Sequence, residues 1–274
     1  LVPGGAHLAN WRAAFASGRA KIWLDWINAN AQAVIRRQRP DGSFGYQGKF
    51  LKGHFEDTAS GQCAIFAASL LEHARLTGSQ ESLAAGVKTL EYMKRFRTPR
   101  GAQVWELSLH TPDIMASAWA AIAYTRGYEL TEDPEYLDLA RRWAISGMPF
   151  VYQWSNRPIM SYATIPVYGA THWKGTNWMG LPVQWCGTRY AQALLLLAKH
   201  DQTLDWPKVA EGILIAAEQM QYTDGPTVGL LPDAYELADQ LRRPVDINPC
   251  ALVSLRRQLD GLPARLMLGA DEDH

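Results

Sequence analysis

An all-α fold is predicted by three features of this 274-residue sequence. Apolar residues recur three and four positions apart over long windows, and no stretch sustains the apolar-polar alternation of a half-buried strand. Hydrophobic residues make up 47% and charged residues 20% of the chain, a composition that favours a large packed core over disorder. The predicted helices, about eight or more, are also of two kinds that alternate along the chain.

One kind of predicted helix is apolar on nearly every side, and the other is amphipathic. A helix that is apolar all round is buried on most faces, whereas an amphipathic helix keeps one face in water. The buried kind is expected over residues 58–76, 114–128 and 187–199. The amphipathic kind is expected over residues 82–96, 135–146 and 207–219.

The connections between these helices alternate between short turns and long loops. A short turn leads from each buried helix to the next amphipathic one; at one such turn, Asp133 is expected to cap a helix that has Pro134 as its first residue. A long loop rich in Gly, Pro and Trp leads back to a buried helix. We name these connections loop one (39–57), loop two (97–113), loop three (150–185) and loop four (222–248).

This order predicts helical hairpins arranged in a ring, with the buried helices inside, which is an α/α toroid. The repeat of about 54 to 70 residues is too long for tetratricopeptide or ankyrin arrays, whose units have roughly 33 to 34. The length allows about four to five hairpins. Residues 1–274 are therefore expected to form a single domain that is either an incomplete toroid or part of a longer polypeptide, with all the long loops on one rim.

Charge and hydropathy exclude two classes of partner. Lysine and arginine together number 27, as do aspartate and glutamate, so no basic excess favours nucleic acid. No apolar run approaches the roughly 18 residues of a membrane-spanning helix. We expect a soluble protein that is cytoplasmic, periplasmic or secreted after processing. Cys63, Cys186 and Cys250 fit no metal or redox spacing and are expected to be small buried residues, so no metal or other cofactor is predicted.

Three carboxylates in the long loops are candidate catalytic residues, because functional groups concentrate on loops held by a rigid scaffold. In an aromatic-lined mouth, Asp57, Glu106 and Asp113 could supply a general acid and a general base. Asp57 and Asp113 fit equally well as caps of the helices that follow them. Glu106 has no helix start beside it.

Three histidines occupy successive long loops and could reach one cavity. His110 is a fourth catalytic candidate, and His54 and His172 are candidate substrate-binding residues. Their spacing lacks the close pairs of a metal site, so a hydrogen-bonded positioning role is favoured over a metal.

The 11 Trp and 11 Tyr are more than a core usually needs. We expect those of loop three to form a wall on which sugar rings stack, with polar groups nearby binding hydroxyls; the alternative is core filler beneath the loop. The other candidate binding residues are Trp105, Tyr162, Trp173, Trp178, Gln184, Trp185, Arg189, Asp233 and Glu236. Arg189 is equally compatible with a structural ion pair.

Three short segments resemble known families. Residues 37–44 (Arg-Gln-Arg-Pro-Asp-Gly-Ser-Phe) resemble the Q-x-x-D-G-S-W/F signature of α/α-barrel proteins, among them terpene cyclases, prenyltransferases and many glycosidases. No D-x-D-D or D-D-x-x-D motif occurs, which argues against a terpene cyclase. Residues 54–57 and 112–115, each opening an inner helix, are similar to the aspartate segments of unsaturated glucuronyl and rhamnogalacturonyl hydrolases, which are six-hairpin glycosidases.

The resemblance implies that Asp113 protonates the vinyl ether of the substrate and activates water, with Asp57 as its partner. Sugar epimerases of this architecture use histidines as acid and base, and some toroidal polysaccharide lyases use Tyr, His, Asn and Arg. Such reactions would involve His54, His110, His172, Tyr162 and Arg189.

Three functions follow as hypotheses. The first is a glycoside hydrolase that cleaves an oligosaccharide or polysaccharide, including one that contains uronides, by carboxylate acid-base catalysis. The second is a sugar epimerase or polysaccharide lyase that uses His or Tyr. The third is a noncatalytic glycan-binding module, since the ring is short of hairpins.

Overall fold

The computed structural model describes residues 20–46, 48, 56–104, 108–153, 161–167, 181–236, 239–247 and 249–262. Over these residues the chain forms eight α-helices, one short 3-10 helix and one two-stranded sheet. The helices are α2 (Ala20–Arg37), α3 (Ser60–Thr77), α4 (Gln80–Met93), α5 (Ile114–Thr131), α6 (Pro134–Gly147), α7 (Gln184–Leu197), α8 (Trp206–Met220) and α9 (Cys250–Leu259), with the 3-10 helix η2 (Met148–Phe150) after α6. The predicted all-α class is confirmed, and each helix predicted by range lies within a few residues of its expected position.

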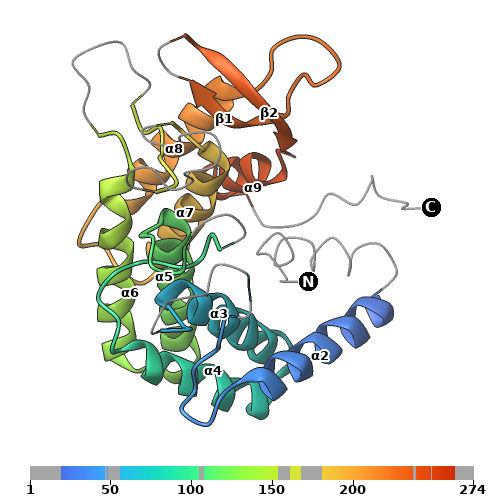
Figure 1. Cartoon of the computed structure of the whole chain (residues 1–274), viewed down its shortest axis with the longest axis vertical. Coiled ribbons are helices and arrows are strands. Elements are labelled where there is room, and N and C mark those ends of the chain that lie inside the picture. The colour runs from blue at the N-terminus through green and yellow to red at the C-terminus, as the bar shows by residue number, and fades with distance from the viewer. Residues whose placement is uncertain are drawn as a thin grey trace.

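Consecutive helices pair into hairpins that form two concentric rows. α3 packs against α4, α5 against α6 and α7 against α8, while α3, α5 and α7 also pack side by side. Figure 1 shows α3, α5 and α7 on the inside of an arc whose outer edge is formed by α4 and α6. At the two ends of the arc, α2 packs on α3 and α4, and α9 packs on α7 and α8. This arrangement is an α/α toroid with three complete hairpins among the described residues.

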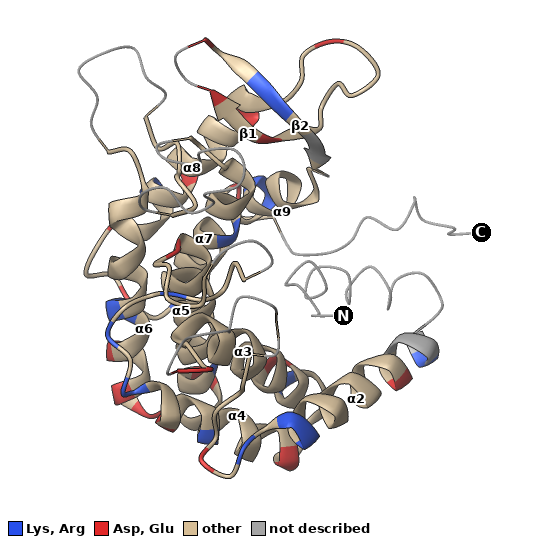
Figure 2. Ribbon diagram, viewed as in Figure 1, with Lys and Arg blue, Asp and Glu red and all other residues tan. Residues whose placement is uncertain are grey.

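The inner helices can be buried because most of their side chains are apolar or small. On α5, side chains are buried from Ile114 to Thr125 except for Met115, and many of them are alanines. Short side chains let neighbouring helices approach from three directions at interior packing density. Charged residues gather instead on the outer helices, as Figure 2 shows for α6.

Two tyrosines of the inner helices make the same contact in successive hairpins. The buried Tyr124 hydroxyl on α5 donates to the Leu90 carbonyl on α4 at 2.8 Å. The buried Tyr190 hydroxyl on α7 donates to the Ala144 carbonyl on α6. A Cβ at Gly147 would lie 2.3 Å from the Tyr190 ring, so the close approach there requires glycine. Each tyrosine thus ties an inner helix to the outer helix of the preceding hairpin.

The short turns carry the expected stop and start signals. Gly78, with φ at 73°, ends α3 in the left-handed region, and Ser79 caps α4. Asp133 accepts a hydrogen bond from the Glu135 amide at 2.9 Å, and Pro134 is the first residue of α6. The predicted cap and first-turn proline are therefore confirmed.

The long loops are bonded to one another in series, at the opposite end of the hairpins from the short turns. Loop one meets loop two where the Tyr46 hydroxyl donates to the Val104 carbonyl at 2.9 Å. Loop two meets loop three through the bridge between Asp113 and Val167, and loop four meets loop three through the hydrogen bond from the Tyr235 amide to the Pro182 carbonyl at 2.8 Å. The prediction that the long loops share one rim is confirmed.

Loop four contains a β-ribbon that the sequence pattern did not predict. β1 (Leu231–Glu236) pairs antiparallel with β2 (Leu241–Ile247), with an irregularity between Pro232 and Ala234. Both strands are short and each contains a proline, so neither shows a clear alternation of apolar and polar residues.

The cysteines follow expectation only in part. Cys63 and Cys186 are buried, but Cys250 is exposed at the start of α9, so its predicted burial is wrong. The reason is that α9 is a peripheral helix that buries only Leu252 and Leu255. Among the described helices, none combines the length and the apolar character needed to cross a bilayer.

Candidate functional site

The structure distributes the predicted site residues over the rim. Outside the described residues lie His54, Trp105, Glu106, His172, Trp173 and Trp178. Near the N-termini of α3 and α5 lie Asp57, His110 and Asp113. Where loops three and four meet lie Tyr162, Gln184, Trp185 and Asp233, while Arg189 is in the second turn of α7 and Glu236 is in the ribbon.

Asp57 is held as a half-exposed anion by an arginine of the predicted signature segment. Its Oδ1 accepts from Arg39 Nη1 at 2.7 Å, and a second contact joins Oδ2 to Nη2. The Asp57 side chain remains 40% exposed. The hydrogen bonds from Arg39 lower the pKa of this carboxyl. The residue that caps α3 is Ala59, so the alternative of Asp57 as a helix cap is wrong.

Asp113 is a buried carboxyl at the N-cap of α5. Its Oδ1 accepts from the Ala116 amide at 2.7 Å and its Oδ2 from the Ala102 amide at 3.0 Å. The residue is only 1% exposed, and burial raises its pKa to about 7 against the opposing effect of these amide donors. The predicted capping role is confirmed, and the second hydrogen bond also fastens loop two to the start of α5.

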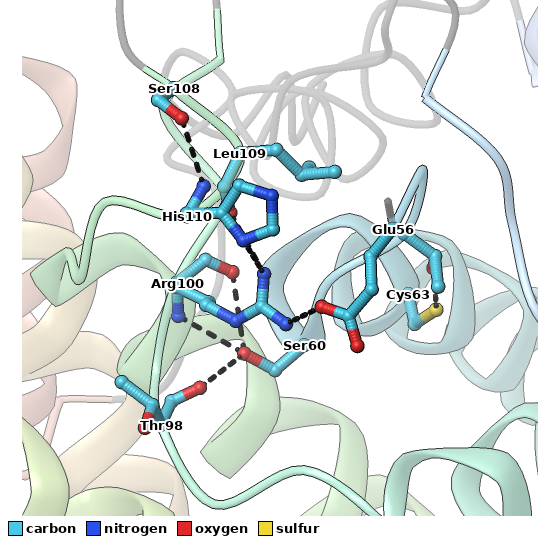
Figure 3. Close-up of polar contacts among 9 residues, drawn as sticks. Glu56, Ser60, Cys63, Thr98, Arg100, Ser108, Leu109 and His110 are labelled. Atoms are coloured by element: carbon cyan, nitrogen blue, oxygen red, sulfur yellow. Dashed lines mark hydrogen bonds and ion pairs between the residues drawn. The ribbon is translucent and has the colours of Figure 1, made fainter. Parts of the chain in front are cut away.

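At the junction of loops one and two lies a polar group that we name the Arg100 cluster: Glu56, Ser60, Arg100 and His110 (Figure 3). The Arg100 guanidinium, on loop two, pairs with Glu56 of loop one and contacts His110 Nδ1 at 2.9 Å. Ser60 Oγ, in the first turn of α3, accepts from the Arg100 amide at 3.1 Å. The cluster therefore brings an acid, a cation and a histidine from two loops together beside the N-terminus of α3.

Trp185 joins α7 to the ribbon. Its Nε1 donates to Asp233 Oδ1 at 3.0 Å, and burial raises the pKa of Asp233 although this hydrogen bond opposes the shift. Glu236 pairs across the ribbon with Arg243. Loops three and four thus place an indole beside a half-buried carboxyl.

Two predicted binding residues hold the scaffold of loop three. The buried Gln184 amide accepts from the Thr164 amide at 2.9 Å and donates to the Ile213 carbonyl at 2.8 Å. Tyr162 has φ at 63°, and its ring lies so close to Gly212 that a Cβ there would be 2.4 Å from the ring. Both contacts fix loop three against α7 and α8.

Arg189 lies on the face of α7 that also carries Trp185 and Gln192, because these positions are four and three residues apart. Its guanidinium donates to Gln192 Oε1 at 2.5 Å and lies 5.0 Å from the centre of the Trp119 ring of α5. Burial lowers the pKa of Arg189 to about 10. No ion pair joins it to an acidic residue within the described part of the chain, so the structural ion pair considered from the sequence is not found there.

Glu56 and Arg100 are functional candidates that residue patterns did not single out. Glu56 stands beside Asp57 in the segment that resembles the hydrolases, and Arg100 is the cation between Pro99 and Gly101 in loop two. Either could have drawn attention, but their pairing spans 44 residues and leaves no local pattern. Among the described residues, no three His, Cys, Asp or Glu side chains gather as a metal site.

No protein-family model and no curated protein sequence matches this chain. Solved structures do match it. The unsaturated glucuronyl hydrolase of Bacillus sp. GL1 has a TM-score of 0.60 at 14% identity, over 91% of this chain and 70% of the hydrolase. An inactive variant of an α-1,6-mannanase of Salegentibacter sp. HEL1_6 has a TM-score of 0.59 at 16% identity, over 87% and 64% of the two chains.

The cellobiose 2-epimerase of Spirochaeta thermophila has a TM-score of 0.55 at 13% identity, over 86% of this chain and 62% of the epimerase. These proteins carry different activities on one architecture, as a widely used fold allows. The chain therefore has the α/α toroid fold of the six-hairpin enzymes.

Proposed function

We propose that this protein is a carbohydrate-active enzyme that hydrolyses an oligosaccharide bound at the loop rim. The observation that carries the proposal is the junction of loops one and two, which brings Asp57, the Arg100 cluster and Asp113 to the adjacent N-termini of α3 and α5. Glycoside hydrolysis uses a pair of carboxyl groups, one protonated and one charged. The similar solved structures include two glycoside hydrolases by name.

The two described carboxyls differ in the way this reaction needs. Arg39 keeps Asp57 charged, which suits a general base or nucleophile. Burial brings the pKa of Asp113 to about 7, which suits a general acid at neutral pH. Because both oxygens of Asp113 accept from amides, its use as an acid requires that loop two open at Ala102. Glu106, on the same loop and outside the described residues, is the other candidate for the acid.

The substrate we propose is an acidic saccharide, such as an oligosaccharide that contains uronides. Arg189 supports this substrate class, because its guanidinium has no acidic partner among the described residues and lies over Trp119. A guanidinium without an acidic partner can bind a carboxylate of the substrate through charge-assisted hydrogen bonds.

Incubation with a panel of neutral and uronide-containing oligosaccharides, the latter with and without the unsaturated terminal ring, tests the proposal. We expect new reducing ends from the uronide-containing set. Asp57→Asn and Glu106→Gln variants are expected to lose about 10²-fold or more in kcat/KM if each takes part in proton transfer. A variant with full turnover removes that residue from the mechanism.

Two other outcomes would replace the proposal. Products that are epimers of the substrate, or that carry a new double bond, would assign an epimerase or a lyase. Saccharide binding without turnover over days would assign a noncatalytic glycan-binding module.

A further inference from the structure

We infer that Arg100 is a positioning residue that holds His110 as a neutral hydrogen-bond donor through Nε2, so that His110 is not the general base of the site. The inference rests on the proposed function for its catalytic meaning. The protonation state that it assigns can be measured without any substrate.

Arg100 is itself fixed in place by contacts of its main chain. Its amide donates to Ser60 Oγ at 3.1 Å, and its carbonyl accepts from the Gly61 amide at 2.9 Å. The amide of the neighbouring Gly101 donates to the Thr111 carbonyl at 3.4 Å. The main chain is therefore fastened both to the first turn of α3 and to the end of loop two, and the Arg100 side chain is only 14% exposed.

Arg100 is the donor in its hydrogen bond with His110. A guanidinium has donors and no acceptor, so in the contact of 2.9 Å it is His110 Nδ1 that accepts. The neutral ring must then carry its proton on Nε2. Protonation of Nδ1 would remove this hydrogen bond and set an imidazolium beside a guanidinium. The acidic partner of the Arg100 guanidinium is Glu56, which binds Nη2 and keeps the guanidinium in place.

A catalytic base histidine is commonly oriented by a carboxylate or carbonyl that accepts from Nδ1, which leaves Nε2 as the basic atom. Here the orienting group is the Arg100 cation, which donates to Nδ1. The proton of the neutral ring therefore lies on Nε2, and the basic nitrogen Nδ1 is already engaged. A neutral imidazole of this kind donates from Nε2 to an oxygen that gains negative charge. In a hydrolase, that oxygen would belong to a sugar hydroxyl or to the leaving group, and proton abstraction would fall to a carboxylate.

The experiment has a part that does not depend on turnover. Protein labelled with ¹⁵N in its histidines is studied by NMR at about pH 8.5, where histidine rings are neutral, and the His110 signals are assigned from a His110→Gln variant. We expect wild type to show the shifts of the Nε2-protonated form alone. In Arg100→Met both nitrogens should shift toward a mixture of the two neutral forms. The exposed Arg97, three residues earlier, provides the control variant Arg97→Met, which should leave the His110 signals unchanged.

The second part uses a substrate that the enzyme turns over. In His110→Gln an amide N–H can replace the imidazole donor, so we expect kcat/KM within about tenfold of wild type, whereas His110→Ala should lose about 10²-fold. Arg100→Met should lower kcat more than it raises KM. Arg100→Lys should not restore kcat, because a single ammonium cannot make the two directed hydrogen bonds that the guanidinium makes to Glu56 and His110.

A proton found on Nδ1 of wild-type His110 at this pH would overturn the inference whatever the activity. So would losses of about 10³-fold or more in both His110→Gln and His110→Ala, the result expected of a general base. If the NMR result holds while no saccharide is turned over, the proposed function fails and the assigned state of His110 stands.

Discussion

Charged side chains form a cluster at the loop rim and a second one at the short-turn end of the hairpins, and the two differ in the burial of their acidic members. At the rim, the Arg100 cluster joins loops one and two, and its Glu56 side chain is 54% exposed. At the opposite end lies what we name the turn-end network: Glu72, Arg75, Arg126, Glu129 and His200. It joins the last turns of α3 and α5 to the end of α7.

The turn-end network is a chain of ion pairs. Arg126 contacts both Glu72, at 2.9 Å, and Glu129. Glu72 also pairs with Arg75 at 2.6 Å, and Glu129 with His200 Nε2 at 2.9 Å. Burial alone would raise the pKa of Glu129, but the hydrogen bonds from His200 and Arg126 lower it. The acidic side chains of the turn-end network are thus only 11% and 18% exposed, whereas Glu56 at the rim is more than half exposed.

The largest expected effect concerns Asp113, because this carboxyl lies at the rim and is nevertheless buried. Its folded-state pKa of about 7 exceeds the value of about 3.9 expected in the unfolded chain, so the folded state binds more protons between these values. The stability it contributes is complete below about pH 4 and is lost as the pH rises to about 7, by up to ~4 kcal/mol. Urea unfolding of wild type and Asp113→Asn from pH 4 to 8 should show this loss in wild type alone.

Asp57→Asn is the matched control, since Arg39 lowers the pKa of Asp57. A lowered carboxyl pKa stabilises the protein above the unfolded value and is lost as the pH falls. The difference between wild type and Asp57→Asn should therefore grow slightly with pH, opposite in sign to that of Asp113. Equal trends for both variants would contradict the assigned environments.

Breaking the turn-end network should be the second largest effect. Arg126→Met removes the guanidinium that pairs with both Glu72 and Glu129, and both carboxylate side chains are less than 20% exposed. The free energy of unfolding should fall by about 3 kcal/mol, as for a buried pair that loses one member, while turnover is retained by the folded fraction. Chemical denaturation checks this result. Lys21→Met, which removes a largely exposed pair on α2, should leave stability nearly unchanged.

The helices were predictable because their signals are local. Periodicity located α3 to α8, and Asp133 with Pro134 marked the start of α6. The ribbon escaped prediction because Pro232 and Pro244 interrupt the alternation of apolar and polar residues in two short strands. Of the two interpretations of Asp57, the cap was wrong because its partner is Arg39, 18 residues earlier, and the contact between Glu56 and Arg100, 44 residues apart, leaves no local pattern.

Arg39→Met should have a smaller effect on stability and a diagnostic effect on pH dependence. Because both side chains of the pair are about 40% exposed, solvent screens it, and the expected loss in free energy of unfolding is under about 1 kcal/mol. Without Arg39 the pKa of Asp57 rises toward its ordinary value. If Asp57 acts as a charged base, the acid limb of kcat/KM moves to higher pH, and a pH-rate profile measures the shift. An unmoved limb would remove Asp57 from that role.

The smallest effect is expected where loop four meets α7. Trp185→Phe keeps an aromatic ring but deletes the donor to Asp233, so the free energy of unfolding should fall by about 0.5 to 1.5 kcal/mol. The same deletion removes the hydrogen bond that opposes the effect of burial, and the pKa of Asp233 should rise further. Titration of Asp233 by ¹³C NMR measures that rise.

If the indole also stacks on a sugar, Trp185→Phe should retain most of the saccharide affinity and Trp185→Ala should lose it, because the ring rather than the N–H makes the contact. Equal affinity in both variants would place Trp185 with the scaffold, as the turn-end network is, and leave loops one and two as the part of the rim that meets the ligand.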